Sequence, residues 1–246
     1  MRSLAVLIIA FGASLLASLS GGSSSMITTP AWMALGASFP AAVAADKVAG
    51  MFWTVSAARA YLANVLIDRR LLFSMGIAGL AGAFAGAAIA TTVDERILRR
   101  AAGMLILLAL VASGSSSRRS SSSTDRPTDR PTDWISTVLA FPLGVYEALL
   151  GSGNGILTSA LLVRTRGFDL PTALGHYYAL AALWCALAAG VYFARGAFDW
   201  HLALPATLGA MAGGTLGARI GRKAGSKLIR PLFIVIGLVV AIRLLL

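Results

Sequence analysis

Two polar stretches interrupt long apolar runs: Gly21-Gly22-Ser23-Ser24-Ser25 and Gly151-Ser152-Gly153-Asn154-Gly155. The first lies between the apolar segments 4–19 and 26–37, and the second lies between 134–150 and 156–163. An unwound backbone is costly in lipid unless it is buried in protein or lines a wet cavity. If the chain is a membrane protein, two breaks in matching surroundings predict where a ligand binds.

The composition indicates that the chain is embedded in a membrane. Of its 246 residues, 57% are hydrophobic and only 13% are charged, and the mean hydropathy is +0.79. Soluble domains carry about 25% charged residues, and a bilayer span needs about 20 apolar ones. Several stretches meet that length, so we expect a bundle of helices that crosses the membrane more than once.

The formal net charge is +11, which on a soluble protein would suggest nucleic acid binding. Here the basic residues lie mainly between apolar runs, so they indicate orientation in the membrane and contact with anionic lipid headgroups. The single cysteine, Cys185, excludes a disulfide within the chain, and only two histidines are present, His176 and His201. We therefore expect no metal, no cofactor and no nucleic acid partner.

Three segments divide the chain. Residues 1–112 and 134–246 are mostly apolar, whereas residues 113–133 are rich in serine and contain Thr-Asp-Arg-Pro twice. Such a composition cannot pack a core, so it predicts a flexible linker outside the bilayer. The remaining apolar segments of the two halves are 40–65, 71–91, 101–112, 171–193, 202–218 and 232–246.

The two apolar halves repeat one another. At an offset of 131 residues Pro40 matches Pro171, and at an offset of 130 residues Thr28 matches Thr158. Each half also carries a row of small residues at a spacing of four, which lets two helices approach closely in lipid. The rows are Ala78, Gly82, Gly86 and Ala90 in the first half and Gly209, Gly213, Gly217, Gly221 and Gly225 in the second.

Duplicated halves are typical of secondary transporters. We expect the basic segment 219–230 to be a loop that faces the cytoplasm. Tracing back through two spans then brings Arg164 and Arg166 to the same side. If the halves are inverted, the segment 68–70 also lies on this side. Each apolar segment before a break then forms a hairpin with the short segment after it. The predicted fold is an all-α, polytopic helical bundle of two homologous, inverted repeats with paired discontinuous, re-entrant helices.

The breaks form the predicted site for an anion. Each is followed by the start of a short helix, where free N–H groups and a partial positive charge suit a negative ligand. The alternative is that glycine and serine only permit tight helix packing. The residues predicted to contact the anion at the breaks are Gly22, Ser23, Ser24, Ser25 and Thr28, and Gly151, Ser152, Gly153, Asn154 and Thr158.

Ionisable residues inside membrane segments are further candidates. Lys47, and at the corresponding place in the second half His176 and Tyr177, are predicted to contact the substrate, with a position at the membrane interface as the alternative. Glu147 and Asp46 are candidates for a coupling proton, because a buried carboxylate binds a proton more readily than an exposed one. A structural ion pair with an arginine is the alternative for Glu147.

Several features occur twice in the same order: a glycine-rich break, a short apolar segment, a helix led by proline, an aspartate near the next span and a row of small residues. This arrangement resembles the TauE/SafE family of sulfite and organosulfur anion transporters over nearly the whole chain except the linker. The family usually has more glycine at the breaks than Ser23-Ser24-Ser25 and Asn154 provide here. The resemblance implies transport of sulfite, thiosulfate, sulfonates or related small anions, without enzymatic activity.

Two other classes of function stay open. A passive anion channel would have the same sequence features, whereas saturable flux with counterflow would favour a carrier. A membrane-embedded enzyme would need a catalytic constellation, and the sequence offers no paired carboxylates, no His-rich motif and no nucleophile with an evident base. For the leading hypothesis, a carrier in the inner (plasma) membrane, the expected partners are a small anion and membrane lipid, with proton coupling and a homodimer left open.

Overall fold

The computed structural model describes residues 2–63, 65–89, 104, 107, 133–151 and 153–245, and the regular structure in these residues is α-helical. The predicted linker, up to residue 132, and most of the segment 101–112 lie outside the described residues. The helices of the first half are α1 (Arg2–Ser20), α2 (Ser25–Ala34), α3 (Phe39–Leu62) and α4 (Arg69–Ile89). Those of the second half are α6 (Asp133–Leu149), α7 (Asn154–Arg166), α8 (Leu170–Ala194), α9 (Trp200–Ala224) and α10 (Ser226–Leu245).

Among the described residues, three helices are long and apolar enough to cross a membrane, namely α1, α4 and α8. The helix α6 is also apolar but shorter, over residues 134–149. These findings confirm the predicted all-helical chain with several candidate membrane spans.

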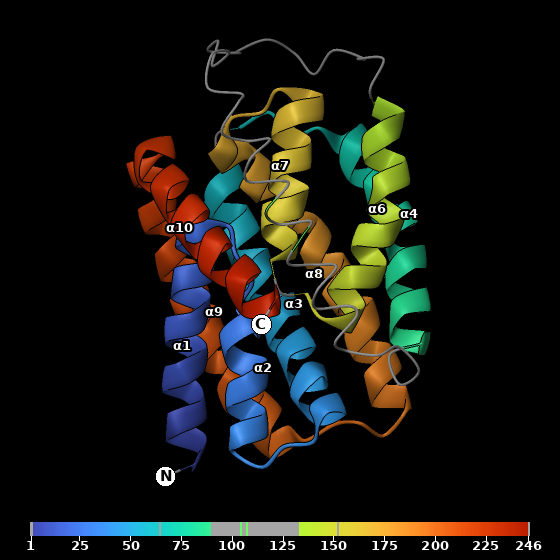
Figure 1. Ribbon diagram of the computed structural model, residues 1–246, viewed down its shortest axis with the longest axis vertical. Coiled ribbons are helices and arrows are strands. Elements are labelled where there is room, and N and C mark those ends of the chain that lie inside the picture. Colours follow the sequence, from blue (N-terminus) through green and yellow to red (C-terminus); the bar gives the residue numbers. More distant parts are fainter. Residues whose placement is uncertain are drawn as a thin grey trace.

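The bundle is built around a central pair of helices, α3 and α8 (Figure 1). α9 packs against α3, and α4 packs against α8. The two helices that precede the breaks then pack on the opposite half of the chain, because α1 lies against α9 and α6 lies against α4. The short helices α2 and α7 lie against α3 and α8 respectively, and α10 contacts α1.

Each break turns the chain back on itself (Figure 1). In this view α1 rises from the lower end and α2 returns to that end, whereas α6 descends from the upper end and α7 returns to it. The helices α3 and α8 run along the bundle in opposite directions. Both short helices therefore begin inside the bundle, away from its two ends.

Four of the long helices begin with a side-chain cap. The residues Ser38, Asp68, Asp169 and Asp199 accept hydrogen bonds from backbone N–H groups in the first turns of α3, α4, α8 and α9. A cap of this kind satisfies a donor that the helix itself leaves unpaired. Pro40 and Pro171 lie in the first turns of α3 and α8, where proline removes no helical hydrogen bond.

The central glycines of the two rows form close helix contacts, as predicted, whereas a β-carbon on Gly225 would meet no atom within 4 Å and Ala90 lies outside the described residues. A β-carbon on Gly213 of α9 would meet the backbone oxygen of Phe11 in α1, and one on Gly217 would lie 2.5 Å from the backbone oxygen of Leu15. Glycine is required here because any side chain would push the two backbones apart. The glycines that pack in this way are Gly209, Gly213 and Gly217 against α1, and Gly82 and Gly86 against α6.

The expected basic loop after residue 218 is wrong. α9 continues through Arg219, Arg222 and Lys223 to Ala224, and α10 begins at Ser226. Lysine and arginine are good helix formers, and their long side chains reach water from a helix that has already left the apolar region. Only Gly225, with a φ of 64°, separates the two helices.

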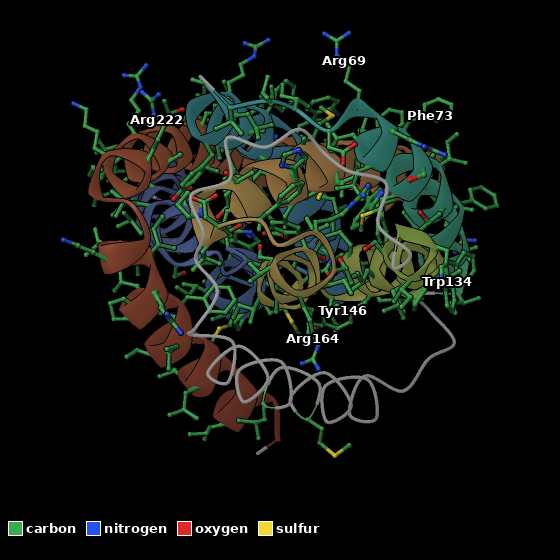
Figure 2. The ribbon with its side chains drawn as sticks, turned by 90° about the horizontal axis from the view of Figure 1, so that it is seen from above. Arg69, Phe73, Trp134, Tyr146, Arg164 and Arg222 are labelled. Atoms are coloured by element: carbon green, nitrogen blue, oxygen red, sulfur yellow. The ribbon has the colours of Figure 1, made fainter. Side chains whose placement is uncertain are left out.

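Basic residues gather at one end of the bundle. Figure 2 looks onto this end, where Arg69, Arg164 and Arg222 project outward from different sides. They belong to the start of α4, the end of α7 and the end of α9, which Figure 1 places together at its upper end. At the other end, the basic residues of the described helix ends and connections are Arg2 and Arg195.

Candidate functional site

The two breaks contact each other in the interior of the bundle. A β-carbon on Gly155 would meet the backbone oxygen of Gly21, and one on Gly151 would lie 3.2 Å from Ser25 Oγ. Both Gly21 and Gly151 have positive φ, at 71° and 66°, which glycine adopts without strain. Glycine therefore provides both the sharp turns and the close approach that join the two breaks.

The short helices begin without the side-chain caps of the long ones. The residues before their first turns are Ser24 at α2 and Gly153, with a φ of 80°, at α7, and neither provides a capping hydrogen bond from its side chain. The first N–H groups of a helix have no partner within it, and together they carry a partial positive charge. The two helix starts therefore place the positive ends of their dipoles in the interior of the bundle, although the Asn154 N–H already donates to the Gly151 carbonyl over 3.1 Å.

A buried ion pair lies beside the second break. Lys47 Nζ of α3 donates to Glu147 Oε1 of α6 over 3.1 Å, and the two side chains are 1% and 3% exposed. A β-carbon on Gly151 would lie 2.5 Å from Lys47 Nζ and 2.8 Å from Glu147 Oε1. Because an unpaired charge is expensive at such burial, each residue requires the other in this state.

Neutral donors from two other helices complete the surroundings of Glu147. Asn154 Nδ2 donates to Glu147 Oε2 over 2.7 Å, and the Tyr177 hydroxyl donates to the same oxygen over 3.3 Å. The Cys185 thiol faces Oε1 at 3.5 Å. The two carboxylate oxygens thus differ, since Oε2 is held by two neutral donors and Oε1 by the lysine ammonium and a weak thiol donor.

A second buried carboxylate, on α3, is bonded to the short helix that follows the first break. The Thr28 hydroxyl of α2 donates to Asp46 Oδ1 of α3 over 2.6 Å, and Asp46 is 5% exposed. Nearby, the hydroxyls of Ser23 and Ser25 share a hydrogen bond of 2.6 Å. The Gly22 N–H is directed back to the end of α1, where it donates to the Ser20 hydroxyl over 3.2 Å.

Three buried polar atoms in the first two turns of α7 have no partner among the described residues, namely Asn154 Oδ1, Thr158 Oγ1 and Ser159 Oγ. All three side chains are fully buried. Buried polar side chains nearly always have a hydrogen-bond partner, so the Thr158 hydroxyl is a donor that a ligand can use. Its counterpart in the first half, Thr28, is already bonded to Asp46.

His176 lies in a different cluster. Its Nε2 accepts a hydrogen bond from the backbone N–H of Asp68 over 3.2 Å, its Nδ1 contacts the Thr172 carbonyl at 2.9 Å, and its ring stacks on Phe168. Asp68 also forms a buried ion pair of 3.1 Å with Arg166. These contacts join the start of α4 to the end of α7 and do not include Lys47 or Glu147.

The structure therefore brings most of the predicted residues into one site. The two breaks, Lys47, Asp46, Glu147 and Tyr177 lie together, whereas His176 lies apart and Ser152 is outside the described residues. Lys47 is the ninth residue of α3 and is buried, so it lies in the interior of the bundle and not at the start of this helix. Sequence reasoning missed Cys185, because a lone cysteine in an apolar run looks like any small packing residue. No group of three or more metal-ligating residues exists in the described part of the chain.

The chain is similar to known proteins over nearly its whole length. The family model described as "Sulfite exporter TauE/SafE" matches residues 6–244. A "Probable membrane transporter protein ORF9" of Sinorhizobium sp is 30% identical over 237 residues, which is 96% of this chain and 89% of the relative. No solved structure matches the chain significantly.

Two further relatives carry similar descriptions. A "Probable membrane transporter protein" of Haemophilus influenzae is 25% identical over 92% of this chain and 88% of its own length. The "Probable membrane transporter protein YfcA" of Escherichia coli is 24% identical over 91% of this chain and 82% of its own length. With the helical architecture described above, these matches identify the chain as a multi-pass membrane transporter, and not an enzyme, of the sulfite exporter TauE/SafE family.

Proposed function

We propose that this transporter carries a small oxyanion of sulfur, such as sulfite, thiosulfate or a sulfonate, which binds where the two breaks meet. The observation that carries the proposal is the convergence of two uncapped helix starts on one buried lysine. The description of the matching family, a sulfite exporter, supports the choice of anion.

The donors at this place suit an oxyanion. Each helix start contributes a partial positive charge of about one half, and Lys47 contributes a full one. The hydroxyls of Ser24, Ser25 and Thr158 are buried at the same helix starts and can donate to several oxygens at once. Sulfite, thiosulfate and sulfonates each present three oxygens, so several donors at one place match their geometry.

We infer further that the two halves are inverted repeats. Gly82 meets the backbone oxygen of Phe141, and Gly213 meets that of Phe11. The glycines are 131 residues apart and the phenylalanines 130, which are the offsets that relate the two halves in sequence. The opposite directions of α1 and α6 and of α3 and α8 (Figure 1) support inversion rather than a parallel repeat.

A second pair of contacts follows the same offsets. The Tyr61 hydroxyl donates to the Ser18 carbonyl over 2.7 Å, and the Tyr192 hydroxyl donates to the Ala148 carbonyl over 3.3 Å. In transporters with inverted repeats the substrate site lies between the repeats at discontinuous helices, and alternating access follows from rocking of one part against the other. The inverted relation of the two halves therefore favours a carrier over a passive channel. We propose that the carrier lies in the inner membrane.

The test is anion binding and counterflow by the purified full-length protein in detergent and in proteoliposomes, with thiosulfate and sulfite as probes. The variant Thr158→Val removes a hydroxyl that has no partner among the described residues, so the melting temperature should stay the same or rise. Loss of one hydrogen bond to a charged ligand costs about 1.5–3 kcal/mol, so thiosulfate affinity should fall about tenfold or more.

The matched control is Ser14→Ala, which removes another buried hydroxyl without a partner in α1, before the first break. This variant should bind thiosulfate as the unmodified protein does. Equal affinity in both variants and the unmodified protein would place the anion away from α7. Absence of saturable counterflow with either anion in the unmodified protein would refute the proposed transport.

A further inference from the structure

The charges at the site do not balance. Asp46, Lys47 and Glu147 are 5%, 1% and 3% exposed, and with all three ionised the cluster carries one net negative charge. A buried charge without a partner is expensive inside a membrane protein. The anion of the proposed function would add a further negative charge, so its binding requires a compensating change in the cluster.

The geometry shows which group can change. Among the described residues, Lys47 Nζ is the cation that lies against the second break, and its hydrogen bond goes to Glu147 Oε1. An arriving anion must therefore take over a donor that Glu147 now uses. Asp46 is in a different position, because its Oδ1 is held by the neutral Thr28 hydroxyl, which an anion has no reason to displace.

The two oxygens of Glu147 allow this change without moving the side chain. Oε2 accepts from Asn154 Nδ2 and from the Tyr177 hydroxyl, and the carbonyl oxygen of a protonated acid accepts the same two bonds. Oε1 depends on Lys47, with only the weak thiol donor of Cys185 beside it. A proton on Oε1 would leave both oxygens with suitable roles and would free the ammonium group.

We propose that Glu147 and the substrate anion compete for the Lys47 ammonium group, so that each anion binds together with one proton on Glu147 Oε1. The inference rests on the proposed anion site. The proton comes from water, Lys47 keeps its own charge, and release of the anion returns the proton and restores the ion pair. A monovalent anion then moves without net charge, and a divalent anion moves one negative charge.

Among the residues that the structure describes, few groups face Glu147 from other helices. They are Lys47 and Asp46 on α3, Asn154 on α7, and Tyr177 and Cys185 on α8. In α4, which packs on α6, the ionisable side chains are Arg69 and Arg70 in the first turn. Asp46 is therefore the other carboxylate that the test must separate from Glu147.

The experiment uses the full-length protein in proteoliposomes with the membrane voltage clamped by potassium and valinomycin. Thiosulfate is the probe, because it takes up no proton near neutral pH, and sulfite is measured beside it. With one proton per anion, each pH unit of imposed gradient should support about tenfold accumulation, since tenfold corresponds to about 1.4 kcal/mol. Counterflow is measured separately, because exchange of anion for anion needs no net proton movement.

The variant Glu147→Gln imitates the protonated state, since its amide oxygen can accept from Asn154 and Tyr177 while Lys47 is free. It should keep counterflow but lose accumulation driven by the pH gradient. Asp46→Asn, whatever its rate of counterflow, should keep the accumulation driven by the pH gradient, because Glu147 still binds the proton. The double variant Lys47→Gln/Glu147→Gln removes both charges of the ion pair and leaves the net charge of the cluster unchanged, so it should fold and yet lose counterflow.

Each outcome decides one claim. If the unmodified protein carries neither anion, the proposed function fails, and if it carries them without any effect of pH, only the coupling fails. Accumulation by Glu147→Gln, or its loss in Asp46→Asn alone, would overturn the role of Glu147. If Glu147→Gln does not fold, calorimetry of thiosulfate binding to the unmodified protein in two buffers decides, with uptake of roughly one proton per anion expected and no uptake contradicting the proposal.

Discussion

Gly151 lacks a β-carbon at the point where Lys47 approaches Glu147. Its φ of 66° is in the left-handed region, and a side chain would collide with the atoms of the ion pair. The same residue therefore serves the turn and the site. The absence of a side chain at Gly151 lets the charged groups of Lys47 and Glu147 lie directly against the second break.

We predict that Gly151→Ala yields a folded protein whose thiosulfate transport is strongly reduced. The matched control is Gly196→Ala, because Gly196 has a φ of 71° but no atom within 4 Å of a β-carbon. An L-residue in the left-handed conformation costs roughly 1–2 kcal/mol, which both variants share. Thermal melting should therefore show a small loss of stability in both variants, because each places alanine in the left-handed conformation. Gly151→Ala should lose more, because its methyl group also meets the ion pair.

Thiosulfate counterflow should be normal in Gly196→Ala and strongly reduced in Gly151→Ala. Normal counterflow in a folded Gly151→Ala protein would mean that the ion pair tolerates displacement.

Individual residues of the site can be predicted from the sequence, but their partners cannot. Lys47 and Glu147 each interrupt an apolar run, which is enough to identify both as candidates. Their pairing joins residues 100 positions apart in the two halves, and helix periodicity specifies a face but not the helix that covers it.

His176 shows a second limit, because the offset of 131 places it opposite Ala45 and places Tyr177 opposite Asp46. One residue along a helix turns a side chain by about 100°, so His176 faces the Asp68 cluster instead.

At the scale of the helix, the rows of glycine decide which elements pack together. The spacing of four predicts a close contact from sequence alone, and the structure supplies the partner, which for α9 is α1 and for α4 is α6. The partner is not predictable from the period, because each helix packs on one from the other half of the chain. The end of α9 is also unpredictable from hydropathy, since the helix continues through basic residues to Gly225.

We predict opposite signs for two glycine-to-alanine changes in helices. Gly190 of α8 has no atom within 4 Å of a β-carbon, so Gly190→Ala should leave stability unchanged or raise it by about 1 kcal/mol, as alanine favours helix. Gly213→Ala should destabilise the protein by about 1–3 kcal/mol, because the methyl group would overlap the backbone of Phe11.

Melting in detergent by circular dichroism measures both changes, and Gly213→Leu should be more severe than Gly213→Ala. A Gly213→Ala protein that melts like Gly190→Ala would show that α1 and α9 can separate without cost.

At the scale of the whole molecule, the two ends differ in charge although the halves resemble each other. The end seen in Figure 2 carries Arg69, Arg164 and Arg222, and the buried pair of Asp68 with Arg166 lies at the helix ends there. Asp199 caps α9 as its equivalent Asp68 caps α4, but the position equivalent to Arg166 in the first half is Gly36, which cannot form the ion pair. The ends are therefore chemically distinct, and this asymmetry gives the molecule a direction in the membrane.

We predict that the basic end faces the cytoplasm, because loops rich in lysine and arginine stay on that side of the membrane. Single exposed positions test this orientation, namely Arg222→Cys near the end of α9 and Ala34→Cys at the end of α2 (Figure 1). The native Cys185 is buried and should give little background with a membrane-impermeant maleimide.

In intact bacterial cells that express each variant, Ala34→Cys should be labelled and Arg222→Cys should be labelled only after the cells are broken. Arg219, Lys223, Lys227 and Arg230 remain in Arg222→Cys, so the loss of one charge should not reverse the insertion. Labelling of Arg222→Cys in intact cells, with Ala34→Cys protected, would reverse the orientation and would make the buried Asp68–Arg166 cluster a feature of the outer face.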